Sequence, residues 1–173
     1  MEQAKFGAVL LAAGNSTRMG GSRSKVLEEL GGRPALCRSL EVLDRCPLIG
    51  EICLVCREQD RADMLPLTSG LATPVQVVPG GAQRQDSVEQ GVEALTGHWE
   101  YVAIHDGARP LVTEEVLAAV CRDAMAYGAA TAAVPSKDTC KLADGAGFVA
   151  ATPARDRLWA VQTPQAFSLA LYR

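Results

Sequence analysis

The sequence has 173 residues, of which 48% are hydrophobic and 21% are charged, and this balance is ordinary for one soluble globular domain spanning residues 1–173. The formal net charge of −3 argues against a general nucleic-acid or anionic-membrane binder, so an anionic ligand must meet a local cluster of cations. Neither a signal peptide nor a run near the roughly 20 apolar residues of a membrane span is recognisable. We therefore expect a cytoplasmic protein that acts on a small anionic substrate.

Predicted strands and helices alternate along the first 135 residues. Short apolar runs predict strands over 6–11, 52–56, 75–78, 101–104 and 129–134. Apolar residues at helical spacing predict helices from Pro34, over 59–65 ending before Pro66, from Asp86 or Ser87, and after Thr113 as N-cap. This alternation predicts a doubly wound α/β fold, with a mostly parallel sheet and helices on both faces.

The stretch from Val9 to Lys25 is typical of a buried strand that delivers its end to a phosphate. The apolar run ends in small residues up to Gly14, and the polar loop that follows carries Arg18, Arg23 and Lys25. Glycine can adopt positive φ there and let backbone N–H groups approach an anion. The spacing matches neither the Walker A motif nor the dinucleotide fingerprint. A phosphate-binding loop of a third kind is expected, and the alternative is a glycine-bearing turn with solvated charges.

Two further polar turns follow predicted strands, PGGAQRQDS after Val78 and HDGARP after Ile104. In a doubly wound sheet the ligand site lies beyond the carboxyl ends of the strands, so all three turns should meet at one edge. Asp106 at a strand end is a natural oxygen ligand for Mg²⁺, although a solvated pair of Asp106 and Arg109 is the alternative.

The six cysteines indicate reduced core residues. Cys53 and Cys56 form a Cys-x-x-Cys pair inside a predicted strand, where an offset of three places the sulfurs on opposite faces. Since neither His98 nor His105 lies at ligand spacing from a thiol, no structural zinc site is expected.

Residues 136–159 lack a helical period and contain a turn signal at Asp144, which predicts a protruding β-arm outside the main sheet. Apolar residues such as Phe148 and Trp159 favour packing of this arm on a partner chain, and a flexible surface loop is the alternative. The final residues AFSLALYR, with Ser168 as a cap, predict the start of a helix that stops after about one turn. A C-terminal truncation of the domain is therefore expected.

Five segments in order resemble the 2-C-methyl-D-erythritol 4-phosphate cytidylyltransferase family: VLLAAGNSTRMG…SK, PGGAQRQDSV, HDGARP, KDTCK and ARDRLWAVQTPQAF. Together they cover nearly the whole chain. The resemblance implies a Rossmann-like nucleotidyltransferase fold and a reaction in which the phosphate of methylerythritol phosphate attacks the α-phosphorus of CTP and releases pyrophosphate. It also implies Mg²⁺ as cofactor and a homodimer formed through the 136–159 arm.

The resemblance also implies a role for each matching residue. Catalysis falls to Arg18, Lys25 and Arg155, nucleotide binding to Ala12, Ala13, Gly14, Gly81, Ser87 and Asp106, sugar-phosphate binding to Asp106, Arg109, Thr139 and Arg155, and metal binding to Asp106. Thr139 and Arg155 would reach the neighbouring subunit's site. Ala82 stands where many relatives have an acid, and Ser87 alternatively acts only as a helix cap.

Two alternatives remain. A sister cytidylyltransferase acting on ribitol 5-phosphate would share the loops, but such relatives often have a glycine where this chain has Ala13. The second alternative is an inactive nucleotide-binding fragment, because family members continue with a further strand, an acid and a lysine beyond the point where this sequence ends.

Overall fold

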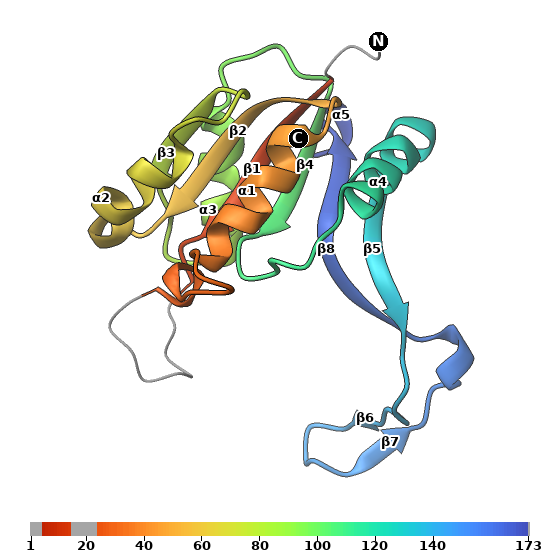
Figure 1. The fold of residues 1–173 in the computed structure, drawn as a ribbon. Helices are drawn as coiled ribbons and strands as arrows, with labels where there is room; N and C mark the ends of the chain where they lie inside the picture. The colour runs from red at the N-terminus through yellow and green to blue at the C-terminus, as the bar shows by residue number, and fades with distance from the viewer. Residues whose placement is uncertain (1–4, 15–23, 173) are drawn as a thin grey trace.

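The fold is built on a six-stranded sheet, seen in a computed structural model that describes residues 5–14 and 24–172 (Figure 1). The strand order is β3-β2-β1-β4-β8-β5. The strands are β1 (Phe6–Ala12), β2 (Ile49–Cys56), β3 (Val75–Pro79), β4 (Tyr101–Asp106), β5 (Ala129–Pro135) and β8 (Trp159–Ser168). Strands β1 to β4 are parallel to one another, and β8 runs antiparallel between β4 and β5. The predicted mostly parallel sheet is confirmed.

Helices cover both faces of this sheet. They are α1 (Ala35–Arg45), α2 (Arg61–Met64), α3 (Arg84–Ala94), α4 (Glu114–Tyr127) and α5 (Leu169–Tyr172), with 3₁₀ turns at Lys25–Leu27, Glu58–Asp60, Leu65–Thr68 and Arg155–Arg157. Side chains of α1, α2 and α4 pack into one hydrophobic cluster, and those of α3 and α5 into the other. Thr113 caps α4 as predicted, because its Oγ1 accepts from the Val116 N–H at 3.3 Å. The helix predicted to end before Pro66 does so, since α2 ends at Met64, and a 3₁₀ turn follows with the proline in its first turn.

Strand β1 alternates between the two clusters. Ala8 and Leu10 face one cluster and Val9 the other, as the two-residue period of a strand requires. Cys53 and Cys56 likewise fall in opposite clusters, as predicted. Burial raises the pKa of Cys53 to about 12 and that of Cys56 to about 11, so both stay protonated thiols.

The cysteines match the prediction with one exception. Five are buried, but Cys140 is exposed, because it lies in the segment that leaves the sheet after β5. No group of three or more metal-ligating side chains occurs within residues 5–14 and 24–172.

Helix α3 packs closely on the sheet because of Gly91. A Cβ at this position would lie 2.5 Å from Val9 Cγ1 and 2.8 Å from Val55 Cγ2. A glycine weakens a helix intrinsically, but here its lack of a side chain brings α3 onto β1 and β2.

Strand β8 is the main departure from the sequence prediction. The helix predicted over AFSLALYR is present only as Leu169–Tyr172, because Ala166 to Ser168 still belong to β8. Ser168 does act as a cap, since its Oγ accepts from the Leu171 N–H at 3.3 Å. The sheet therefore gains an antiparallel strand that the periodicity did not predict.

Residues between β5 and β8 leave the sheet. There β6 (Leu142–Ala143) and β7 (Val149–Ala151) form a separate two-stranded sheet, which projects away from the main sheet in Figure 1. The predicted turn is present, with Asp144 Oδ1 accepting from the Ala146 and Phe148 N–H groups at 2.9 Å each. Within the described parts of the chain, no helix is long and apolar enough to cross a membrane.

Candidate active site

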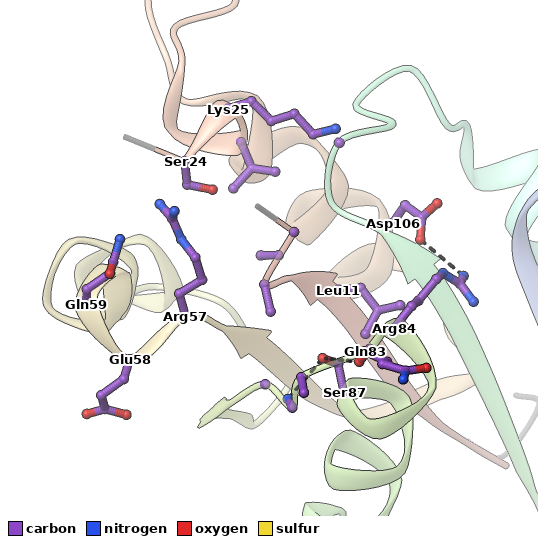
Figure 2. Close-up of a pocket in the computed structure, with 18 residues that line it drawn as sticks. Leu11, Ser24, Lys25, Arg57, Glu58, Gln59, Gln83, Arg84, Ser87 and Asp106 are labelled. Carbon is purple, nitrogen blue, oxygen red and sulfur yellow. Dashed lines mark hydrogen bonds and ion pairs between the residues drawn. The ribbon is translucent and has the colours of Figure 1, made fainter. Parts of the chain in front are cut away.

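A cleft of about 640 Å³ opens at the carboxyl edge of the parallel strands. Its walls come from the ends of β1, β2 and β4, the 3₁₀ turn that begins at Lys25, and the turn between β3 and α3 (Figure 2). This is the edge at which doubly wound sheets bind their ligands. The three polar turns expected there do converge on one site.

The loop after β1 and the turn after β3 touch because Gly80 has no side chain. A Cβ on Gly80 would lie 2.5 Å from Ala13 Cβ and 2.8 Å from Ser87 Oγ, closer than real contacts allow. The Gly80 N–H donates to the Cys56 carbonyl at 2.8 Å, which ties the same turn to the end of β2. Any larger residue at position 80 would force the floor of the cleft apart.

Ser87 fixes the glycine turn from within α3. Its Oγ accepts from the Gly81 N–H at 3.1 Å and donates to the Gln83 carbonyl at 3.2 Å. The helix begins at Arg84, ahead of the predicted start, and the Gln83 N–H donates to Asp86 Oδ2 at 2.9 Å. The interpretation of Ser87 as a mere helix cap is therefore wrong, because it sits inside the helix and holds Gly81.

Asp106 is held between two guanidinium groups. Its Oδ1 lies 3.2 Å from Arg84 Nη2, and its Oδ2 lies 3.5 Å from Arg109 Nε. Arg109 was expected beside it, but Arg84 was missed. It comes from the previous turn, and no local pattern marks a contact across 22 positions. The carboxylate thus joins the second and third polar turns across the cleft.

Cations outnumber acids around the cleft. Lys25 and Arg57 lie across the opening from Arg84, and Glu58 and Asp106 are the acidic residues among the lining side chains (Figure 2). Arg57 forms a bidentate ion pair with Asp60, including an Nη2–Oδ1 contact of 2.9 Å. This pair holds the guanidinium in a fixed orientation at the rim. An excess of positive charge suits a polyanionic ligand.

The carboxylates present fit one kind of metal site. Mg²⁺ keeps several waters and binds through one or two carboxylates together with substrate phosphates. Asp106 supplies such a carboxylate at the cleft, and Glu58 lies on another wall. A protein cage made of side chains alone does not fit, because these two are the acids that line the cleft in the part of the chain described.

Most of the predicted site residues line or adjoin the cleft. Lining the cleft are Ala12, Ala13, Gly14, Lys25, Gly81, Ser87 and Asp106, whereas Arg109 adjoins it through its ion pair with Asp106. Gly14 does not adopt the positive φ that glycine allows, and a Cβ there would meet no atom of the described residues within 4 Å. Arg18 lies outside the described residues.

Thr139 and Arg155 are not brought to this cleft within one chain. Both belong to the segment that projects from the sheet, where Arg155 Nη1 donates to the Lys137 carbonyl at 3.3 Å. Their side chains are exposed.

The chain was compared with known protein families. The family model described as 2-C-methyl-D-erythritol 4-phosphate cytidylyltransferase matches residues 6–173. The chain belongs to this family.

Relatives of that name support the assignment over most of the chain. The enzyme of Desulforamulus reducens is 44% identical, over 95% of this chain and 71% of its own length. The enzyme of Prochlorococcus marinus is 42% identical, over 93% of this chain and 72% of its own length.

Solved cytidylyltransferase structures share the fold. The 4-diphosphocytidyl-2C-methyl-D-erythritol synthase of Anaerococcus prevotii superposes with a TM-score of 0.84 at 34% identity, covering 97% of this chain and 73% of the other. The 2-C-methyl-D-erythritol 4-phosphate cytidylyltransferase of Thermus thermophilus gives 0.70 at 29% identity, covering 99% and 72%. Family membership therefore agrees with the site at the carboxyl edge of the sheet.

Proposed function

We propose that this protein joins CTP and 2-C-methyl-D-erythritol 4-phosphate to give 4-diphosphocytidyl-2-C-methyl-D-erythritol and pyrophosphate. A phosphate oxygen of the sugar attacks the α-phosphorus of CTP, and the bond from that phosphorus to the bridging oxygen of the β-phosphate breaks. No covalent intermediate on the enzyme is needed. Membership of the cytidylyltransferase family supports this assignment.

The observation that carries the proposal is the convergence of three turns on one cleft. Ala12 to Gly14 supply backbone without bulky side chains, Gly81 and Ser87 form the opposite wall, and Asp106 closes the third side. A nucleotide that enters between the first two turns would place its phosphates toward Lys25. Preorganised cations and dipoles are the main requirement of such a transfer, since negative charge builds on the oxygens at the α-phosphorus.

Roles for individual residues follow from this placement. Lys25, together with Arg18, would neutralise charge on the triphosphate, and Ser87 would hold the Gly81 turn against the base. Arg109 would attract the sugar phosphate beside Asp106. Mg²⁺ bound by Asp106 and the CTP phosphates would supply further positive charge.

We further propose that the protein works as a homodimer and that Thr139 and Arg155 complete the partner's site. Exposed apolar side chains on and near the arm support this proposal, including Phe148, 72% exposed, and Trp159, 59% exposed. Such a surface is unfavourable in water and typical of an interface. A cytoplasmic location is also proposed, and the free cysteines support it.

Pyrophosphate release tests the proposed reaction. The purified protein is assayed with CTP and Mg²⁺ in the presence of methylerythritol phosphate, ribitol 5-phosphate or neither. We expect pyrophosphate release when methylerythritol phosphate is the added sugar phosphate, and none with ribitol 5-phosphate or without a sugar phosphate. Release with ribitol 5-phosphate instead would indicate the sister activity, and CTP binding by calorimetry without any release would indicate a nucleotide-binding protein. Asp106→Asn is the matched variant for this assay, because asparagine keeps the shape of the Asp106 side chain and removes its charge.

A further inference from the structure

Thr163 of β8 connects the cleft to a buried histidine. Its Oγ1 lies 3.0 Å from the Asp106 backbone nitrogen and 3.0 Å from His105 Nδ1. The other ring nitrogen, His105 Nε2, lies 3.2 Å from the Arg109 carbonyl oxygen. Thr163 is 7% exposed and His105 is 2% exposed, and neither lines the cleft.

The partners fix the direction of every hydrogen bond in this network. The Arg109 carbonyl can only accept, so His105 must carry its proton on Nε2. Nδ1 of the neutral ring is then an acceptor, and the Thr163 hydroxyl donates to it. A lone pair of the same hydroxyl oxygen accepts from the Asp106 N–H.

The network forms hydrogen bonds with both ends of one turn. Its first end is the Asp106 N–H and its second is the Arg109 carbonyl, and the turn between them closes with an Arg109 N–H bond to the Asp106 carbonyl at 2.9 Å. The side chains of Asp106 and Arg109 face each other across the same turn at 3.5 Å. The orientation of both therefore depends on a hydroxyl from a distant strand.

We propose that Thr163 and His105 are positioning residues for the cytidylyl transfer. They fix the backbone turn that presents Asp106 and Arg109 to the sugar phosphate. This inference rests on the proposed function and extends it to two residues outside the cleft. Small displacements of a positioned group slow such reactions strongly, since a shift of about 1 Å can lower the rate about 100-fold.

Thr163→Val tests the role of the hydroxyl, since valine keeps the shape and removes the hydrogen bonds. We expect kcat/KM for methylerythritol phosphate to fall about 10-fold to about 100-fold, with CTP affinity changed less than about threefold. Thr163→Ser, which keeps the hydroxyl, should recover most of the activity. Thr131→Val on the neighbouring strand β5 is the matched control, because it removes an exposed hydroxyl bonded only to the Ala132 and Gln162 carbonyls among the described residues. Unchanged sugar-phosphate kinetics in Thr163→Val would overturn the proposal.

A double-mutant cycle separates positioning from simple stabilisation. If Thr163 acts through the turn, Thr163→Val should cost less in the Arg109→Ala background than in the unmodified protein, because one of the two groups that it positions is already gone. A loss that is fully additive in the Arg109→Ala background would contradict a positioning role. Should Thr163→Val fail to fold, His105→Asn replaces it in the same cycle, because asparagine keeps an acceptor for Thr163 but has no atom in the place of Nε2, which bonds the Arg109 carbonyl.

The ring tautomer gives a readout that needs no substrate. The sequence has only two histidines, and His98→Gln assigns their ¹⁵N resonances. The Nε2–H tautomer is expected for His105, and an Nδ1–H tautomer would overturn the network even in an active enzyme. An unmodified protein that shows the Nε2–H tautomer but no turnover would instead contradict the proposed function, and the positioning role with it.

Discussion

Glu51 is a buried charge with an unusually complete set of donors. Its carboxylate accepts from the Thr96 and Gly97 N–H groups, the Thr96 hydroxyl, Trp99 Nε1 and Gln76 Nε2, at 2.8–3.1 Å. Burial by itself raises the pKa of Glu51, but these hydrogen bonds outweigh it and lower the pKa to about 2. One side chain on β2 thus anchors the loop between α3 and β4 by accepting its hydrogen bonds.

This carboxylate should make stability depend on pH. A pKa lower in the folded than in the unfolded state means that the stabilisation is complete above about pH 4.5 and is lost as the pH falls toward 2. Glu51→Gln should lower the free energy of unfolding by about 2–3 kcal/mol at pH 7 and flatten this acid dependence. Urea unfolding at several pH values measures both effects. Glu93→Gln on the exposed side of α3 is the control, and an equal acid slope in both variants would contradict the assignment.

Lys25 should matter for turnover and little for folding. It lines the cleft, and loss of a preorganised charge at a phosphoryl-transfer site costs about 100-fold or more in rate. Lys25→Ala is therefore expected to reduce pyrophosphate release about 100-fold with an unchanged unfolding midpoint. Lys5 forms an ion pair with Glu100 and does not line the cleft, so Lys5→Ala should leave turnover unchanged. Equal turnover in Lys25→Ala and the unmodified protein would remove Lys25 from the mechanism.

Residues of the site could be predicted wherever their signal is local. Small residues at a strand end indicated Gly14 and Gly81, and an acid at a strand end indicated Asp106. Arg84 and Thr163 carry no such signal, since each acts through a contact made only after distant turns meet. Tertiary contacts of this kind leave no periodicity in the sequence.

At the scale of elements, β8 shows why local pattern failed. A proline within a run argues against a strand, because it lacks the N–H that a ladder needs. Pro164 escapes this conflict. On the β4 side, the pairing of β8 ends at Gln165. On the β5 side, the register of β8 shifts between Gln165 and Val161. Proline thus occupies an irregular stretch between paired residues, and the strand on either side remains intact.

The arm should determine the oligomeric state. Phe148→Asp places a charge at an apolar side chain that is 72% exposed, so it should weaken a dimer without unfolding the monomer. Sedimentation velocity should show a dimer for the unmodified protein and a monomer for the variant, with equal thermal midpoints. Tyr127→Asp at the end of α4, 82% exposed and outside the arm, is the control. A monomeric unmodified protein would contradict the proposed dimer.

For the whole molecule, the separation of the arm from the cleft predicts complementation. Lys25→Ala and Arg155→Ala should each be nearly inactive alone. If Arg155 serves the partner's cleft, each heterodimer in an equal mixture of the two variants contains one intact site. Since about half of the dimers are heterodimers, roughly a quarter of the full activity should return. The mixture is denatured, refolded and assayed for pyrophosphate release. No recovery, despite heterodimers detected by mass spectrometry, would place Arg155 in the cleft of its own chain.

The position of β8 also bears on the order in which the molecule can be built during synthesis. Its partners β4 and β5 are complete by Pro135, yet the strand that joins them begins only at Trp159. Until the ribosome has released those later residues, β4 has an unpaired edge and β5 has no neighbour in the sheet. Such edges invite pairing with other chains, so the nascent chain is exposed to aggregation during this interval. Slowing translation over residues 136–158 would lengthen that interval, whereas β1 to β3 could pair normally.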